Sequence, residues 1–333
     1  MAKNDYTEGN GKNKNDQLRS ALAKIAELAS RAIDGGEVYE ESALWEESNG
    51  QERRPGCIIK FPPTRLLEKA AQVARSINPA NAPALGPLAA VMREGQEISP
   101  LAIAVLTSKY WGPEPRKLTV SFMERTPADL RARIISHMNA WRRTVGISFV
   151  ETRDTGDVRI SREPGGYWSY LGTDILLIPR NRQTMNLEGF TMSTDESEYR
   201  RVVRHETGHS LGGPHEHMRK SLVARIDREK AYRWFWENYR WDKATVDAQV
   251  LTPLDEESIM GTPSDQTSIM CYQLPADITK DSKPILGGAD INETDYEFMG
   301  KIYPKPGRAA AAQKEEWSVS EDVEVEVAQY ARL

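Results

Sequence analysis

The chain has 333 residues, of which 39% are hydrophobic and 28% are charged, ordinary values for a globular protein of about two domains. Its 44 basic and 49 acidic residues give a formal net charge of −5, so the strongly basic character typical of nucleic-acid binding is missing. The apolar stretches fall short of the ~18 residues that a membrane span requires. The polar N-terminus also lacks the apolar segment of a signal peptide, so we expect a cytoplasmic or non-classically exported protein. The oligomeric state stays open.

The first part of the chain, residues 1–105, is predicted to be a mostly helical extension that begins with a disordered lead. Apolar residues at helical spacing predict one amphipathic helix over Asp16–Ile33. A second helix is predicted from Thr64 to Ile77, where a Pro-rich stretch ends it. Because this extension precedes the part that carries the chemistry, it is a candidate for a removable inhibitory pro-segment.

Residues 106–307 are predicted to form an α+β domain, and residues 308–333 a C-terminal tail. Short runs rich in β-branched and aromatic residues predict the strands, at 118–122, 147–151, 158–161 and 174–178. Longer stretches with helical periodicity predict the helices, at 127–145 and 229–241.

The histidines are concentrated at one place. The chain has five, and four of them lie within the thirteen residues from His205 to His217. His205 and His209 stand in an H-E-x-x-H motif, so on a helix they lie on one face and can bind one metal ion. Gly212 can end this helix in the left-handed conformation and let the chain bring His215 up as a third ligand. Three imidazoles leave one position open, as in a catalytic zinc site.

Glu206 follows the first histidine and can reach a water molecule in the open position without binding the metal itself. The motif therefore predicts one zinc ion per chain and a glutamate general base. The alternative is a helix whose histidines only make hydrogen bonds in a core. The exact offsets of Gly212 and His215 argue against that alternative.

The motif H-E-x-x-H-x-x-G-x-x-H, followed 55 residues after His215 by Ser-Ile-Met-Cys-Tyr with Met270, is the metzincin signature. Within the metzincins the chain resembles the astacin family. Five features carry the resemblance, namely Glu216 after the third histidine, Arg219 three residues later, Tyr272 after the Met-turn, the aromatic segment 167–172 and the segment 291–304. The resemblance implies a metzincin (zincin-like) fold, with a twisted mixed β-sheet, a zinc-binding active-site helix and a Met-turn.

Some family features are missing. Astacin domains usually carry two disulfides, whereas this chain has only Cys57 and Cys271, and Cys271 stands where the family usually has a histidine. An insertion also follows Arg219. These departures suggest a bacterial-type, disulfide-free relative and leave the zinc ligands and the base unchanged.

The resemblance implies a zinc metalloendopeptidase that acts on protein or peptide substrates. Tyr272 would stabilise the developing oxyanion, and Met270 would pack beneath the ligands. A strand before the zinc helix would form the rim of the cleft and pair with the substrate. The matching residues here are Gln183, Thr184, Met185, Asn186 and Leu187.

Several residues also have simpler interpretations. Tyr272 could be a core tyrosine, and Glu216, which resembles a residue that contacts the freed N-terminus in astacins, could be a surface ion-pair partner. His217 is expected not to bind the metal, and His137 is expected to be structural. Cys57 is a candidate thiolate for the open zinc position, but its surroundings match the known cysteine-switch motif poorly and an ordinary buried cysteine is expected.

Two other functions stay open at this stage. One is a catalytically silent metzincin that binds a protein, although such modules tend to lose the glutamate that Glu206 supplies here. The other is a zinc hydrolase of a small amide, which would have a deep narrow pocket instead of a long cleft.

Overall fold

The computed structural model describes residues 57–81, 108–253 and 264–306. The helix expected at 16–33 and the tail expected at 308–333 lie outside this part of the chain. Among the described residues, no helix has the length and apolar character needed to cross a membrane.

Six short strands form one mixed sheet. They are β1 (Cys57–Lys60), β2 (Arg116–Phe122), β3 (Ile147–Glu151), β4 (Val158–Ser161), β5 (Tyr167–Tyr170) and β6 (Met185–Leu187). Their order across the sheet is β1-β5-β6-β4-β2-β3. Only the β5–β6 pair is antiparallel, so β1 and β5 run against the other four strands. This mixed sheet, with its helices, confirms the predicted α+β class.

The helices are short, and they fall into two groups by length. The longer ones are α2 (Leu67–Ile77), α5 (Ala128–Met138), α7 (Arg204–Ser210), α9 (Arg228–Tyr239) and α11 (Glu293–Ile302). Shorter ones are α6 (Glu196–Glu198), α8 (Lys220–Val223) and α10 (Lys243–Val246). Segments of 3-10 helix are η1 (Thr64–Leu66), η2 (Asn139–Arg143), η3 (Gly172–Leu177), η5 (Glu216–Met218) and η8 (Ala276–Ile278). The π turns are η4 (Tyr199–Val203) and η6 (Asp247–Leu251).

Within the described residues, the element predictions are confirmed except in two places. The strand expected at 174–178 is the 3-10 segment η3, because Gly172 takes a left-handed φ of 45° and starts a turn there. A short apolar run cannot by itself distinguish a strand from a helical turn. The helix expected at 127–145 ends as an α-helix at Met138, because the Asn139 side chain then bonds to the carbonyl of Ile135 and the backbone of Phe149.

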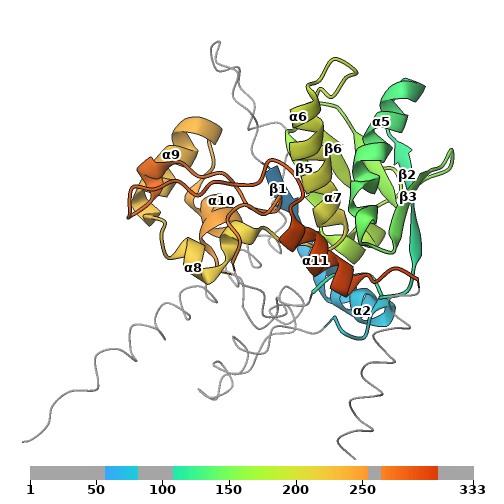
Figure 1. Cartoon of the computed structure of the whole chain (residues 1–333), viewed down its shortest axis with the longest axis horizontal. Coiled ribbons are helices and arrows are strands. Elements are labelled where there is room, and N and C mark those ends of the chain that lie inside the picture. Colours follow the sequence, from blue (N-terminus) through green and yellow to red (C-terminus); the bar gives the residue numbers. More distant parts are fainter. Residues whose placement is uncertain (1–56, 82–107, 254–263, 307–333) are drawn as a thin grey trace, which may run out of the picture.

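Two hydrophobic cores divide the molecule. The larger core lies between the sheet and helices α5, α7 and α11, and it includes Trp141 and Tyr199. The smaller core lies under α8, α9 and α10 and includes Phe235 and Trp241, whose rings stack at 5.1 Å. Figure 1 shows these helices as a group apart from the sheet.

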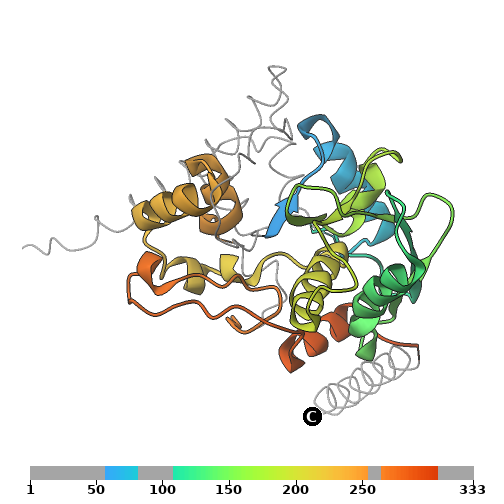
Figure 2. The same ribbon diagram turned by 90° about the horizontal axis from the view of Figure 1, so that it is seen from above.

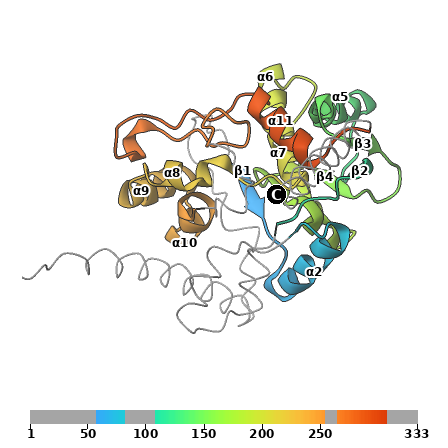
Figure 3. The same cartoon turned by 60° about the horizontal axis from the view of Figure 1, so that its bottom comes forward.

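Strand β1 lies between these two groups. Seen from above, its blue arrow separates the orange helices from the sheet (Figure 2), and the tilted view places it between α10 and α7 (Figure 3). Because β1 comes from the predicted extension, this part of the extension is packed against the domain as an edge strand.

Candidate metal centre

Helix α7 carries the first two histidines and the glutamate of the motif. It continues the turn of α6 and the π turn η4, so one helical run extends from Glu196 to Ser210. His205, Glu206 and His209 are all buried on it, with Glu206 and His209 fully inaccessible. Polar side chains that can ionise are rarely buried in this way without a ligand or a partner.

The turn after α7 brings the third histidine back. Gly212 has a φ of 93°, and a Cβ atom there would lie 2.9 Å from the ring of Tyr110 and 3.1 Å from the Lys109 carbonyl oxygen. Both the backbone conformation and the space therefore require glycine. The chain then reaches His215, which is fully buried.

The three predicted ligands meet at one point. The Nε2 atoms of His209 and His215 lie 3.1 Å apart, and the centroids of the His205 and His209 rings are 4.7 Å apart. A tetrahedral zinc ion with bonds of ~2.0–2.1 Å to nitrogen holds such atoms about 3.3 Å apart. The donor set therefore fits zinc with a small adjustment.

The fourth position of this group is filled by Cys57. Its Sγ atom lies 3.1 Å from Nε2 of His205 and 3.4 Å from Nε2 of His209. The ligand atoms of Cys57 and the three histidines all lie within 4.8 Å of one another. The expectation that Cys57 is an ordinary buried cysteine is thus wrong, since its thiol completes a four-ligand group.

The outer nitrogens of two ligands are fixed by the backbone. Nδ1–H of His205 donates to the carbonyl of Ile269 (2.6 Å), and Nδ1–H of His209 donates to that of Gly213 (2.7 Å). These bonds leave each Nε2 free to bind a metal. Burial also lowers the pKa of His205 to about 4 and that of His209 and His215 well below the usual value, so all three are neutral, as metal binding requires.

The predicted Met-turn lies directly beneath the helix. A Cβ atom on Gly208 would come within 2.3 Å of the Met270 sulfur, so the thioether fills the space that this glycine leaves. The backbone around Met270 also holds two ligand segments, because the Ile269 carbonyl accepts from His205 and the Met270 carbonyl accepts from the N–H of Glu216 (2.8 Å).

An aspartate of α11 anchors the Met-turn. The Asp295 carboxylate accepts from the Ser268 hydroxyl (2.5 Å) and from the N–H of Ile269 (2.9 Å). The same carboxylate closes the capping box of α11 with Asn292. The closing helix and the metal site are therefore held by one side chain.

Glu206 lies beside the ligands with no strong partner. Apart from a weak interaction with the Cys57 thiol, its carboxylate oxygens have no hydrogen-bond partner among the described residues. Burial raises the pKa of Glu206 to about 8, although the thiol and the charge of Arg201 lower it in part. A buried carboxyl group beside the metal ligands, with an elevated pKa, fits a proton-transfer role.

Tyr272 packs against the histidines. Its ring meets those of His215 and His217 edge to face, each at 4.8 Å, and its buried hydroxyl has no partner among the described residues. His217 lies outside the ligand group and donates from Nε2 to the Gln249 carbonyl (3.0 Å). The hydroxyl of Tyr272 is thus held next to the site without a structural hydrogen bond.

The structure corrects the expected substrate strand. Met185–Leu187 forms β6, which pairs with β4 on one side and with β5 on the other. The backbone of Thr184 is paired in the same way, with Arg159 and Tyr170. The segment from Gln183 to Leu187 therefore has no free edge for a substrate, and β5 is the strand next to the site.

The remaining polar residues have structural contacts. His137 is buried against the ring of Tyr199 and lies 3.4 Å from Glu196, in keeping with its expected structural role. Glu216 accepts from the N–H of Asp265 (3.0 Å) and lies 3.4 Å from Arg219.

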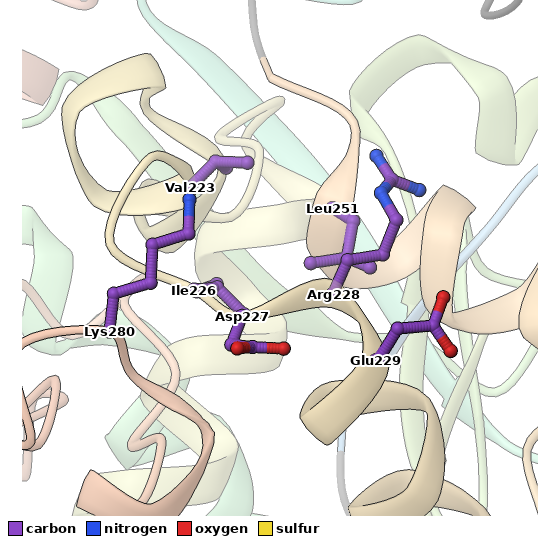
Figure 4. A pocket seen from close by; sticks show the side chains of 7 residues that line it. All are labelled: Val223, Ile226, Asp227, Arg228, Glu229, Leu251 and Lys280. Carbon is purple, nitrogen blue, oxygen red and sulfur yellow. The ribbon is translucent and has the colours of Figure 1, made fainter.

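A separate cavity of about 390 Å³ lies at the start of α9. Figure 4 shows Arg228 and Glu229 on one side of it, Lys280 on the other and Asp227 between them. None of the residues of the metal group lines this cavity.

The sequence analysis did not identify strand β1 or Gln249 as parts of the site. Strand β1 has only four residues, so no periodicity marks it, and Gln249 belongs to a helical segment without a motif. The one usable signal in the sequence was the short apolar run Cys57-Ile58-Ile59, between a Pro-Gly pair and a Phe-Pro-Pro run.

Comparison with known proteins agrees with this geometry. The family model of the astacin peptidases matches residues 105–303. The chain belongs to the astacin family. Its members are zinc metallopeptidases, so the protein is a zinc-dependent peptidase, and the group of histidines is able to hold the metal ion.

Several solved structures are similar to this chain. A structure of myroilysin is 28% identical, with a TM-score of 0.56, and the match covers 59% of this chain and 96% of that one. A second myroilysin structure is 30% identical, with a TM-score of 0.47, over 60% of this chain and 87% of that one. The hatching enzyme HCE-1, a zinc protease of the medaka fish Oryzias latipes, is 22% identical with a TM-score of 0.40. The match covers 56% of this chain and 88% of that one. No curated protein sequence matches the chain.

Proposed function

We propose that the protein is a zinc endopeptidase that its own N-terminal extension holds in a latent form. The observation that carries the proposal is the position of the Cys57 sulfur, 3.1 Å from Nε2 of His205, where a catalytic site would keep an open position. Four protein ligands make a closed site that cannot take water or substrate. The extension would therefore have to leave, with Cys57, before catalysis can begin.

Zinc bound by the three histidines would polarise the scissile carbonyl and lower the pKa of a water in the vacated position. Glu206 then accepts the proton of the attacking water and passes it to the leaving amine. Its burial supports this role, as does the lack of a strong hydrogen-bond partner for its carboxylate oxygens in the part of the chain that the structure describes. The Tyr272 hydroxyl, which has no partner among the described residues, donates to the developing oxyanion.

The substrate is an extended peptide that takes the place of β1. Strand β5 pairs with β6 on its inner edge and with β1 on its outer edge, so the departure of β1 frees one strand edge beside the metal. Backbone pairing to this edge favours unfolded segments or loops of a protein substrate.

The two alternatives fit these contacts less well. A silent binding module has no need of a buried Glu206 beside the ligands. A hydrolase of small amides would need a narrow pocket at the metal, whereas a four-residue strand lies there.

Cleavage of casein by the zinc-loaded full chain tests the proposal, before and after limited proteolysis, with and without a chelator. We expect chelator-sensitive cleavage that begins only after the extension is trimmed. A trimmed chain with one bound zinc that cleaves neither casein nor short peptides would overturn the proposed peptidase activity. Full activity of the intact chain would overturn the latency.

A further inference from the structure

The outer edge of β1 contacts one side chain in a way that resembles a neighbouring strand. The N–H of Ile59 donates to Oε1 of Gln249 (3.1 Å), and Nε2 of Gln249 donates to the Ile59 carbonyl (3.1 Å). One side-chain amide therefore replaces the paired N–H and carbonyl that a strand would offer. Strand β1 thus lies in a slot with β5 as one wall and Gln249 as the other.

The backbone groups of successive residues in β1 point alternately to β5 and to Gln249. Successive residues of a strand in a sheet direct their backbone groups to opposite neighbours. Since Ile59 directs both its N–H and its carbonyl to Gln249, the residues on either side of it are the ones that face β5. Cys57, two residues before Ile59, reaches the metal site at the end of the same slot.

Gln249 is held firmly in its place. It is only 6% exposed, and its own carbonyl accepts from Nε2 of His217. Its π turn is anchored by Asp247, which accepts from the Tyr232 hydroxyl (2.6 Å) and from Arg228. The backbone that carries the amide is therefore fixed by contacts outside β1, so peptide binding has only the side chain of Gln249 left to order.

The two bonds do not depend on the side chain of the residue that they hold. They recognise main-chain atoms that every peptide has. We propose that Gln249 is a substrate-binding residue, which pairs with the main chain of the substrate residue two positions from the one at the metal. This inference rests on the proposed function, since it takes the substrate to occupy the slot that β1 leaves.

Kinetics with a series of depsipeptides test the role. A cleaved octapeptide is made in versions that replace one backbone N–H at a time by an ester oxygen, and each is assayed with the trimmed, zinc-loaded protein. In the wild type, we expect kcat/KM to fall when the ester replaces an N–H that faces β5. It should also fall about 3- to 10-fold at one residue between two of these, and this loss reports on the bond to Gln249. The position scan makes the test independent of the direction in which the substrate lies.

The variant Gln249→Met has nearly the same volume and no amide. We expect KM for the parent peptide to rise about 10- to 100-fold with little change in kcat, because two hydrogen bonds to bound substrate are lost. The variant should also become insensitive to the ester at the one position assigned to Gln249 and stay sensitive at the others. Gln249→Glu keeps an acceptor for the N–H and should keep that sensitivity. It serves as the second variant if Gln249→Met fails to fold.

In the untrimmed chain, the same substitution should have the opposite effect on activity. Because Gln249 also holds β1, its loss should increase the residual activity of the intact chain while it weakens substrate binding by the trimmed one. If Gln249 had a purely structural role, its loss would lower the activity of the intact chain and of the trimmed chain together. The variant Gln273→Met serves as the matched control, because Gln273 lies outside the ligand group and outside the strand pairing of β1. It should change neither the activity of the intact chain nor the KM of the trimmed one.

The outcomes separate the two proposals. If the wild type cleaves the peptide and Gln249→Met shows the same pattern of ester effects as the wild type, Gln249 does not bind substrate. If the trimmed wild type with bound zinc cleaves no peptide, the proposed function itself fails.

Discussion

Replacing Cys57 by alanine separates two proposed effects of β1, namely the thiol at the metal position and the strand backbone in the slot. The substitution removes the sulfur that lies 3.1 and 3.4 Å from the Nε2 atoms of His205 and His209 and leaves the backbone of β1 unchanged. Three histidines remain, which is the ligand number of a catalytic zinc site, so we expect zinc binding to persist. The open position then becomes available whenever β1 leaves its slot.

The remaining contacts of β1 set how active the intact variant can be. The two hydrogen bonds between Ile59 and Gln249 together contribute about 1–3 kcal/mol. A free energy of that size keeps the slot filled roughly 80–99% of the time, since 1.4 kcal/mol is about a tenfold equilibrium constant. Because the pairing with β5 also holds β1 in place, we expect Cys57→Ala to reach at most roughly 20% of the activity of the trimmed wild type without any proteolysis.

The assay compares initial rates of peptide cleavage by the intact Cys57→Ala chain, the intact wild type and the trimmed wild type, with zinc content measured for each. Cys271→Ala is the matched control, because Cys271 is the other buried cysteine and lies outside the ligand group. It should stay as inactive as the intact wild type. If intact Cys57→Ala binds one zinc and is no more active than the intact wild type, although trimming activates both, the thiol is not what blocks the site.

Three further substitutions test other parts of the structure. Glu206→Gln should keep one zinc and lose peptide cleavage by ~10³-fold or more, because the amide cannot accept the proton of water; near-normal turnover would exclude Glu206 as the base. Tyr272→Phe should lower kcat by ~10²-fold at unchanged zinc content, whereas an unaffected rate would make Tyr272 a core residue. Asp174→Asn tests a buried carboxyl, whose pKa burial raises from 3.8 to about 7 even though Lys109 lies 3.9 Å away. Because the folded chain holds this proton more tightly than the unfolded one, the free energy of unfolding should fall as the pH rises from about 4 to 7, by at most ~4 kcal/mol. Denaturant unfolding at several pH values should show a flatter profile for Asp174→Asn, and an identical profile would refute the assignment.

The metal site could be predicted because its pattern is local. His205, Glu206 and His209 lie within five consecutive residues, and helical geometry alone places them on one face. Gly212 fixes the return of the chain to His215 through a backbone conformation that a single residue determines. The family resemblance then supplied the Met-turn, whose sulfur lies against Gly208.

From the sequence, the closure of the site was only one of two interpretations of Cys57, because it depends on contacts between distant parts of the chain. Cys57 is 148 residues from His205, and Ile59 is 190 residues from Gln249. Neither hydrophobic periodicity nor a local motif reports which edge of a sheet a four-residue strand will join. The same limit caused the error at Gln183–Leu187, since a sequence shows that a segment is extended and does not show which strands lie on its two sides.

The slot explains why one segment of the chain can imitate a substrate. An occupant must fit the register of β5, offer an N–H and a carbonyl to Gln249, and present a ligand at the metal. Strand β1 meets the first two requirements with main-chain atoms and the third with the Cys57 thiol. A substrate meets the first two in the same way and differs only at the metal, where it brings a carbonyl that can be attacked. Under the proposed function, latency and substrate recognition therefore share the same contacts, and the Cys57 sulfur is the atom that distinguishes the inhibitory strand from a substrate.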